Sequence, residues 1–300
     1  MGTIAVQLNH PGVEKKHAYR NKFVEGKGYY KIGNQLIREW NNDDSHYRKL
    51  LRQTGTYVEK TKAYKTKNDT LVFWGEWEGY SKFYPLAAGC AKGIHEPFHS
   101  IIGRGCQNTD PYVFGDYFKY AICRQNGVMT ELDKDSLILF GTTTNNGFLL
   151  DSVFVVKTWE TAESVSTNNA INYSQTYKEK TLEQLGGLYL GKNPSLKNKI
   201  YHSRTWWYDE NKDFFSYVPC KINNDKGIKK ALIPFETANS NIKMSKQKIG
   251  HLYNHFSDFT AQEVWKYITD IVLKQGFYLG IRFDEPATNN NLARDKENNF

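Results

Sequence analysis

The strongest local signal in the sequence is a helix over residues 260–275, near the C-terminal end. Thr260 can cap this helix, and Glu263 completes a capping box three residues later. Its apolar stripe consists of Val264, Trp265, Ile268, Ile271 and Val272. Gly276 ends the helix, and 277–283 follows as a strand. Because most other apolar runs are short and rich in β-branched or aromatic residues, we expect an α+β fold on a largely antiparallel β-sheet.

The other expected elements are mostly strands. They are predicted at 4–8, 71–79, 83–88, 117–123, 136–140 and 148–156, with a hairpin of 201–207 and 214–219. Short helices are expected at 43–55 and 177–185, and a long loop at 89–111. We expect one domain over 1–285, basic over 10–67, and a flexible polar tail over 286–300.

Carboxylates interrupt two of the expected strands. If 71–79 is one strand, Trp74, Glu76 and Glu78 share a face, and Trp77 lies on the other face. The glutamates can lie on the solvent side of a half-buried sheet, paired with Lys or Arg across the strands. Alternatively, they line a site in which a flat ring stacks on one of the tryptophans. Asp151 interrupts the apolar run 148–156 and should be paired if it is buried.

The positive charge of the chain is concentrated at its N-terminal end. Residues 1–67 contain 14 Lys or Arg and 6 Asp or Glu, which accounts for the whole net charge of +8. Such a local excess is typical of a surface that binds a polyanion, although a basic, merely solvated surface is the alternative. Aromatic residues make up 15% of the chain, enough to supply stacking surfaces as well as core volume.

The sequence carries no signal for a membrane span, secretion or a bound cofactor. No run approaches the roughly 18 apolar residues of a membrane helix, and no signal peptide begins the chain. The four cysteines have no zinc-site spacing, which is typical of free thiols in a reducing compartment. Motifs for standard nucleotide cradles, acyl transfer and zinc hydrolysis are absent. We therefore expect a cytoplasmic protein without a metal, cofactor, membrane or evident protein partner.

Four strings carry a family resemblance. They are Asn-His-Pro-Gly at 9–12, Phe-Trp-Gly-Glu-Trp-Glu at 73–78, Gln-Asn-Thr-Asp-Pro-Tyr-Val-Phe-Gly-Asp at 107–116 and Leu-Leu-Asp-Ser-Val-Phe-Val-Val at 149–156. Together they resemble a family of uncharacterised bacterial proteins associated with nucleotide modification and phage defence. Asp110-Pro111-Tyr112 is also similar to the core of the water-activating loop of uracil-DNA glycosylases, and His10-Pro11 to their His-Pro-Ser loop. Here Asn108-Thr109 replaces the usual Gly-Gln, and the His-Pro element comes first in the chain.

From these residues and resemblances together we expect a DNA glycosylase that flips out a modified base and excises it. The family resemblance contributes the phage part of this expectation, namely a hypermodified cytosine in phage DNA. Breaking an N-glycosidic bond needs a carboxylate for the cationic sugar, and a flipped base needs rings and amides. The catalytic candidates are Asp110, Glu76 and Glu78. The base-binding candidates are Trp74, Trp77, Asn108, Tyr112, Phe114, Asp116 and His10. The DNA-backbone candidates are Lys15, Lys16, Arg20, Arg48, Lys49 and Arg52.

Two other functions remain open at this point. A non-catalytic reader would hold a modified base or nucleotide in an aromatic cage and depend on Trp74 or Trp77 rather than on Asp110. A magnesium-dependent nuclease would use carboxylates as metal ligands. Its candidate ligands are Glu76, Glu78, Asp110 and Asp116.

Overall fold

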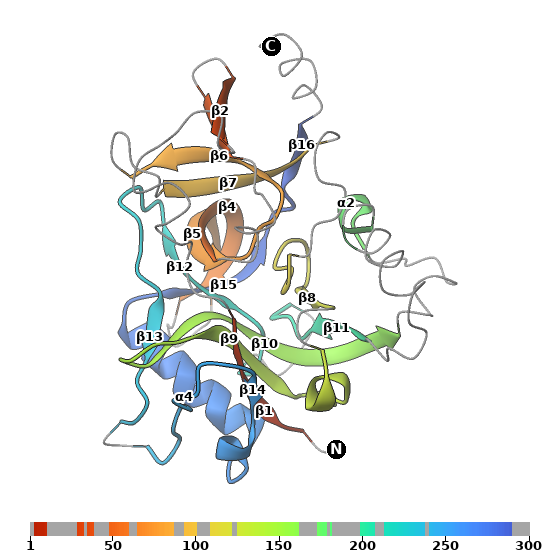
Figure 1. Cartoon of the computed structure of the whole chain (residues 1–300), viewed down its shortest axis with the longest axis vertical. Helices are drawn as coiled ribbons and strands as arrows, with labels where there is room; N and C mark the ends of the chain where they lie inside the picture. The colour runs from red at the N-terminus through yellow and green to blue at the C-terminus, as the bar shows by residue number, and fades with distance from the viewer. Residues whose placement is uncertain are drawn as a thin grey trace.

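The computed structural model shows two mixed β-sheets and a long helix near the C-terminal end (Figure 1), which confirms the expected α+β class. It describes residues 3–10, 29–32, 35–38, 48–59, 65–86, 93–100, 109–121, 125–161, 173–178, 181, 199–207, 213–237 and 240–289. The first half of the strands comprises β1 Ala5–Asn9, β2 Tyr29–Ile32, β3 Gln35–Arg38, β4 Lys49–Val58, β5 Thr66–Gly75, β6 Tyr80–Pro85, β7 Gly93–Ser100 and β8 Lys119–Tyr120. The later strands are β9 Leu137–Thr143, β10 Phe148–Thr161, β11 Lys199–Ser203, β12 Val218–Ile222, β13 Ala231–Ile233, β14 His251–Leu252, β15 Tyr278–Phe283 and β16 Ala287–Asn289. The helices are α2 Gln175–Tyr177 and α4 Ala261–Lys274, with 3₁₀ turns at Gly127–Thr130 and Asn254–Phe256.

The first sheet has the order β14-β1-β9-β10-β11-β8, with β13 also paired to β10. Its β1–β9 pair is parallel, whereas the other ladders are antiparallel. On β9, Leu137 and Leu139 join the apolar cluster of α4, while Ile138 and Phe140 join the cluster that includes residues of the second sheet. Both faces of this sheet are therefore covered, and this explains why its central strands are apolar without alternation.

The second sheet has the order β15-β12-β5-β4-β7-β6-β3-β2, with β16 beside β7. Because β15 also pairs with β4, the strands β4, β5, β12 and β15 close into a narrow ring of antiparallel ladders. A Cβ at Gly55 would lie 2.4 Å from the Arg282 carbonyl oxygen, and a Cβ at Gly280 would lie 2.6 Å from the Phe283 ring. A side chain at Gly55 would therefore displace the backbone of β15, and one at Gly280 would displace the Phe283 ring.

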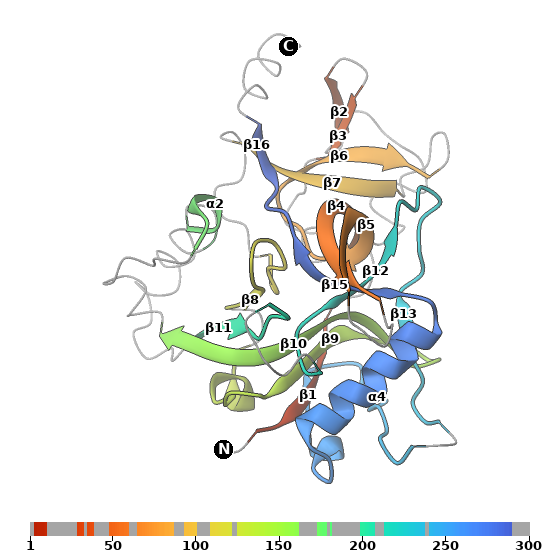
Figure 2. The same cartoon turned by 180° about the vertical axis from the view of Figure 1, so that it is seen from behind.

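Helix α4 forms as its sequence predicts. The Thr260 hydroxyl accepts the Glu263 amide at 3.2 Å, and the Glu263 carboxylate accepts the Thr260 amide at 2.8 Å, so the capping box is confirmed. The apolar stripe packs on the first sheet, and the Trp265 indole donates to the Phe215 carbonyl at 2.7 Å. Figure 2 shows α4 along the outer side of the molecule, next to β13.

Four expected elements were wrong. In place of the helix predicted over 43–55, the described residues from 49 onward form β4. Strand β7 lies within the predicted loop 89–111, and β16 lies within the predicted tail 286–300. The expected hairpin of 201–207 and 214–219 does not form, since β11 pairs with β10 and β8, and β12 pairs with β5 and β15. In each case long-range strand pairing decided a conformation that local propensity left open.

Strand β10 carries two single-residue bulges. Its ladder with β9 skips Asp151, and its ladder with β11 skips Lys157. A bulge leaves the extra residue out of the ladder and turns its side chain in a new direction. Asp151 turns toward buried cations, and Lys157 lines a pocket.

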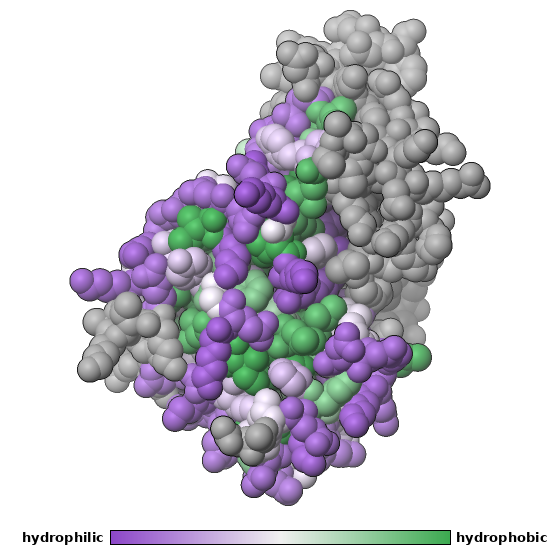
Figure 3. Space-filling model, turned by 90° about the vertical axis from the view of Figure 1, so that its left-hand side faces the viewer, coloured by the Kyte–Doolittle hydropathy of each residue, from purple (hydrophilic) through white to green (hydrophobic). Residues whose placement is uncertain are grey.

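The surface in Figure 3 shows hydrophobic residues in groups between hydrophilic ones. Among the described residues, the large hydrophobic side chains that are exposed are Leu86, Trp207 and Ile249. No helix in the described part of the chain is long and apolar enough to cross a membrane.

Candidate functional site

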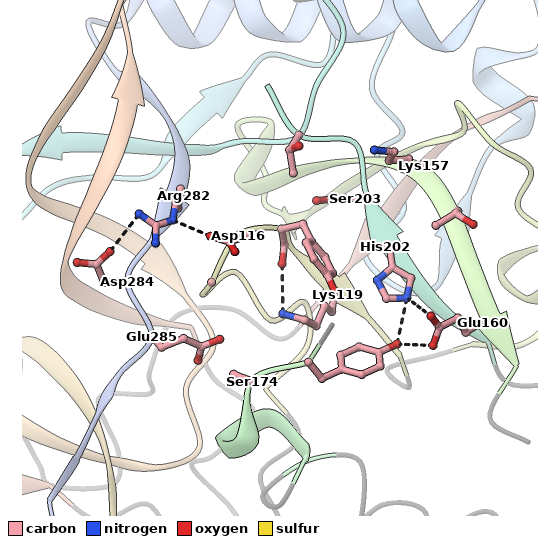
Figure 4. Close-up of a pocket in the computed structure, with 15 residues that line it drawn as sticks. Asp116, Lys119, Lys157, Glu160, Ser174, His202, Ser203, Arg282, Asp284 and Glu285 are labelled. Carbon is pink, nitrogen blue, oxygen red and sulfur yellow. Dashed lines mark hydrogen bonds and ion pairs between the residues drawn. The ribbon is translucent and has the colours of Figure 1, made fainter. Parts of the chain in front are cut away.

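A pocket of about 860 Å³ lies where the two sheets meet (Figure 4). The first sheet contributes side chains from β8, β10 and β11, and the second sheet contributes the end of β15 and the two residues that follow it. Residues 115–117 and the segment before α2 complete the wall. Charged and aromatic side chains dominate this lining, which is typical of a site that binds a polar ligand.

Lys119 of β8 lies at the inner end of the pocket and is 2% exposed. Its ammonium nitrogen lies over the rings of Tyr112, Tyr117 and Tyr177, at 5.0, 4.8 and 5.0 Å from their centroids. Burial lowers the pKa of Lys119 to about 8, although the negative charges of Glu285 and Asp116 oppose this shift. The amine is therefore neutral in a substantial fraction of molecules near pH 8.

Glu285, just after β15, faces the same space as Lys119 (Figure 4). One carboxylate oxygen accepts the hydroxyl of Tyr112, and the other, Oε1, is buried with no hydrogen-bond partner among the described residues. A Cβ at Gly115 would lie 2.7 Å from this Oε1 and 3.8 Å from the Lys119 nitrogen. Gly115 also has a φ of +87°, which favours glycine, and only a glycine fits this closely against the carboxylate.

The opposite wall holds a second polar cluster, formed by Glu160, Tyr173 and His202. The Tyr173 hydroxyl donates to Glu160 at 3.0 Å and lies 3.0 Å from His202 Nε2. His202 Nε2 is also 3.7 Å from the other oxygen of Glu160. Burial, and secondarily the charge of Lys119, lower the pKa of His202 to about 4. His202 is thus neutral at pH 7.

The low pKa of His202 predicts a loss of stability in acid. Unfolded His202 binds a proton near pH 6.5, whereas the folded side chain binds it only near pH 4, so its contribution is present above 6.5 and lost as the pH falls to 4. We expect His202→Gln to flatten the fall in unfolding free energy over this interval by up to about 1.4 kcal/mol per pH unit. Urea unfolding of both proteins at several pH values measures this, and parallel curves would contradict it.

Cations lie on both sides of the pocket. Arg282 contacts Asp116 at 3.1 Å and Asp284 at 3.6 Å, with 38% of its side chain exposed. Lys157, the second bulge residue of β10, lies across the pocket from Arg282 (Figure 4). Two separated cations suit a ligand with a phosphate on each side of its reacting group.

A second pocket, of about 640 Å³, adjoins the first. It lies against β4, β6 and β7, and it shares Asp284 and Glu285 with the larger pocket. The segment between β15 and β16 thus borders both pockets.

All three predicted catalytic carboxylates lie in the interior instead. Strand β5 ends at Gly75, so the shared face expected for Trp74, Glu76 and Glu78 was wrong. Glu76 and Glu78 are 4% and 3% exposed, and neither lines either pocket. Asp110 is 3% exposed, and its carboxylate accepts the Ala121 amide at 3.0 Å. These positions are typical of carboxylates that hold the fold together.

Glu76 belongs to a buried ion cluster that also contains Arg48, Asp151 and Lys230. Arg48 contacts the carboxylates of Glu76 and Asp151, the latter at 3.2 Å. Lys230 forms an ion pair with the other oxygen of Asp151, at 2.6 Å. The side chains of all four residues are at most 3% exposed. The expectation that Asp151 is paired when buried is confirmed.

Several predicted base-binding rings are also core residues. Trp77 and Phe114 are 0% exposed and pack edge to face, with centroids 5.5 Å apart. The indoles of Trp77 and Trp74 donate to the carbonyls of Tyr80 at 2.7 Å and Ile228 at 2.9 Å. With both sides packed, Trp77 and Phe114 offer no face to a flipped base.

The remaining base-binding candidates lie in different places. His10 is buried at the end of β1, with its ring 6.0 Å from that of Phe140. Asp116 lines the pocket. Tyr112 does not line it, but its hydroxyl donates a hydrogen bond to Glu285, which does. Asn108 lies outside the described residues.

Of the three predicted DNA-backbone residues that the structure describes, two are buried. Arg48 and Lys49 are each 1% exposed, so a surface contact with phosphate was wrong for both. Arg52 is paired with Asp225 and stacks on Tyr84, with its guanidinium carbon 5.0 Å from the ring centroid. Lys15, Lys16 and Arg20 lie outside the described residues.

Sequence reasoning missed Lys119, Glu160, His202 and Glu285. One signal was present, because Lys119 interrupts the aromatic strand predicted over 117–123, where a buried cation needs an explanation. No comparable signal marks Glu160, His202 or Glu285. They meet only because β10, β11 and the end of β15 pack together.

Within the described ranges, no group of three or more His, Cys, Asp or Glu side chains is placed to hold a metal ion. No family model, no curated protein and no solved structure matches this chain. The pocket must therefore be interpreted from its own side chains.

Proposed function

We propose that this protein is a DNA glycosylase that excises a modified base, and that the reaction takes place in the pocket between the two sheets. The observation that supports this most is the pair of carboxylates on opposite walls, Glu285 on one side and Glu160 on the other (Figure 4). Cleavage of a glycosidic bond uses two acidic groups that flank the sugar. Cations on each side, Lys157 and Arg282, suit the flanking phosphates.

The proposal gives the polar side chains of the pocket different roles. Glu285, which lines the pocket, stabilises positive charge on the sugar as the base leaves. Glu160 and neutral His202 orient a water molecule for attack on the sugar. Tyr173 links them, since its hydroxyl contacts both side chains at 3.0 Å.

One feature favours this enzyme over an aromatic-cage reader. The rings of Tyr112, Tyr117 and Tyr177 already surround Lys119, so the cage holds a cation of the chain itself. The substrate class follows the resemblance to phage-defence proteins, which points to a hypermodified cytosine.

The test measures free base directly. The purified protein is incubated in EDTA with unmodified DNA and with phage DNA that contains glucosylated hydroxymethylcytosine, and released bases are quantified by mass spectrometry. We expect the modified base to appear in solution and the unmodified bases to stay in the DNA. If the protein binds the modified DNA in a salt-sensitive way but releases no base, the proposal of a glycosylase fails and the non-catalytic reader takes its place.

A further inference from the structure

We infer a second activity for the same pocket: Lys119 forms an imine with the aldehyde of an abasic sugar and thereby opens the DNA strand at that sugar. The substrate class, an abasic site, rests on the proposed function, because base excision creates it. The assignment of Lys119 as the reactive amine does not depend on the proposed function, because it rests on the surroundings of this side chain.

The surroundings of Lys119 suit a nucleophilic amine. Its nitrogen is 3.3 Å from the Tyr117 carbonyl oxygen, and three tyrosine rings surround it. Lys119 lines the pocket of about 860 Å³, so a ligand in this pocket lies beside it. Glu285 lines the same pocket and can move a proton. A desolvated lysine of this kind is the usual origin of imine chemistry in proteins.

The reaction balances without an oxidant or reductant. In an abasic sugar the ring opens to an aldehyde at C1′, and the lone pair of the neutral amine attacks this carbon. A C–N bond forms, the carbonyl oxygen leaves as water, and an iminium ion results. Glu285 then removes a C2′ proton, the C3′–O bond breaks, and the 3′ phosphate leaves with the electron pair. Water finally hydrolyses the imine and returns Lys119.

The charged groups around Lys119 set the pH at which this step works. Burial lowers its pKa to about 8, whereas Glu285 and Asp116 act in the opposite direction. His202 on the opposite wall is neutral at pH 7, and burial keeps Tyr112 and Tyr177 protonated by raising their pKa values. The amine thus reaches its neutral form about 2.5 pH units below an ordinary lysine.

The experiment uses a duplex with one preformed abasic site, so that it does not depend on base excision. Wild-type protein is mixed with this duplex and sodium cyanoborohydride, which reduces an imine to a stable amine. We expect a covalent adduct whose DNA fragment maps to Lys119 by peptide mass spectrometry. Lys119→Met should lower the adduct yield at least about tenfold, whereas Lys243→Met, at a surface ion pair with Glu236, should leave it unchanged.

The pH profile adds a readout that a purely structural lysine would not show. Between pH 8 and pH 9.5 the trapping rate should rise only about twofold, whereas an amine of ordinary lysine pKa would gain about 30-fold. No adduct, or an adduct at other lysines, would overturn the inference even if base release is observed. An adduct at Lys119 without base release from any DNA would instead overturn the proposed excision alone.

Discussion

Asp151→Asn is expected to lower the free energy of unfolding by about 3–5 kcal/mol. The Asp151 carboxylate lies between two buried cations, 3.2 Å from Arg48 and 2.6 Å from Lys230. The neutral amide keeps the volume of the side chain but leaves these cations without their shared counter-charge in a site of low dielectric constant. Urea unfolding at pH 7, followed by circular dichroism, measures the loss.

The matched control is Asp225→Asn. Asp225 is also paired with an arginine, Arg52, but its side chain is 81% exposed. Solvent screens such a pair, so we expect a change below about 1 kcal/mol. Adding Lys230→Met to Asp151→Asn should recover part of the lost stability, because it removes one buried cation. If Asp151→Asn and Asp225→Asn destabilise equally, the buried cluster does not support the fold as described.

The second large effect is on turnover. Glu285→Gln should reduce the rate of base release by about 10²–10⁴-fold while DNA binding changes little, because the amide keeps the Tyr112 contact but cannot carry negative charge. Glu160→Gln on the opposite wall should also slow release. Single-turnover rates and binding constants, measured separately, distinguish the loss of chemistry from the loss of affinity.

Glu236→Gln is the control for this prediction. Glu236 pairs with Lys243 on the surface, and its side chain is 60% exposed. The Glu236→Gln variant should release the base at the same rate as the wild type. Equal rates for Glu285→Gln and Glu236→Gln would remove Glu285 from the reaction and move the chemistry to another group of the pocket.

Elements with a strong local pattern were predictable from the sequence. Helix α4 has its cap, its apolar stripe and its terminal Gly276 within one segment, so no distant contact was needed to recognise it. The apolar run of β10 was also recognised, and the need of Asp151 for a partner followed from charge and burial. Its partners Arg48 and Lys230 were not predictable, because they come from distant parts of the chain.

The side chains of the candidate site were even less predictable from the sequence. Lys119, Glu160, His202 and Glu285 are spread over more than half of the sequence, with no common spacing for a motif search to find. Glu76 and Glu78 were conspicuous locally because carboxylates are unusual in an aromatic strand. Their unusual context had a structural cause, namely the buried cation Arg48 in the case of Glu76.

The position of Glu285 between two strands has a consequence for ligand affinity. Strand β15 is held by β12 and β4, strand β16 is held by β7, and Asp284, Glu285 and Pro286 span the short distance between them. The proline restricts the backbone further. A carboxylate on such a doubly anchored segment is pre-organised before any ligand arrives, so little conformational entropy is lost on binding. More of the interaction energy between ligand and pocket can therefore appear as affinity.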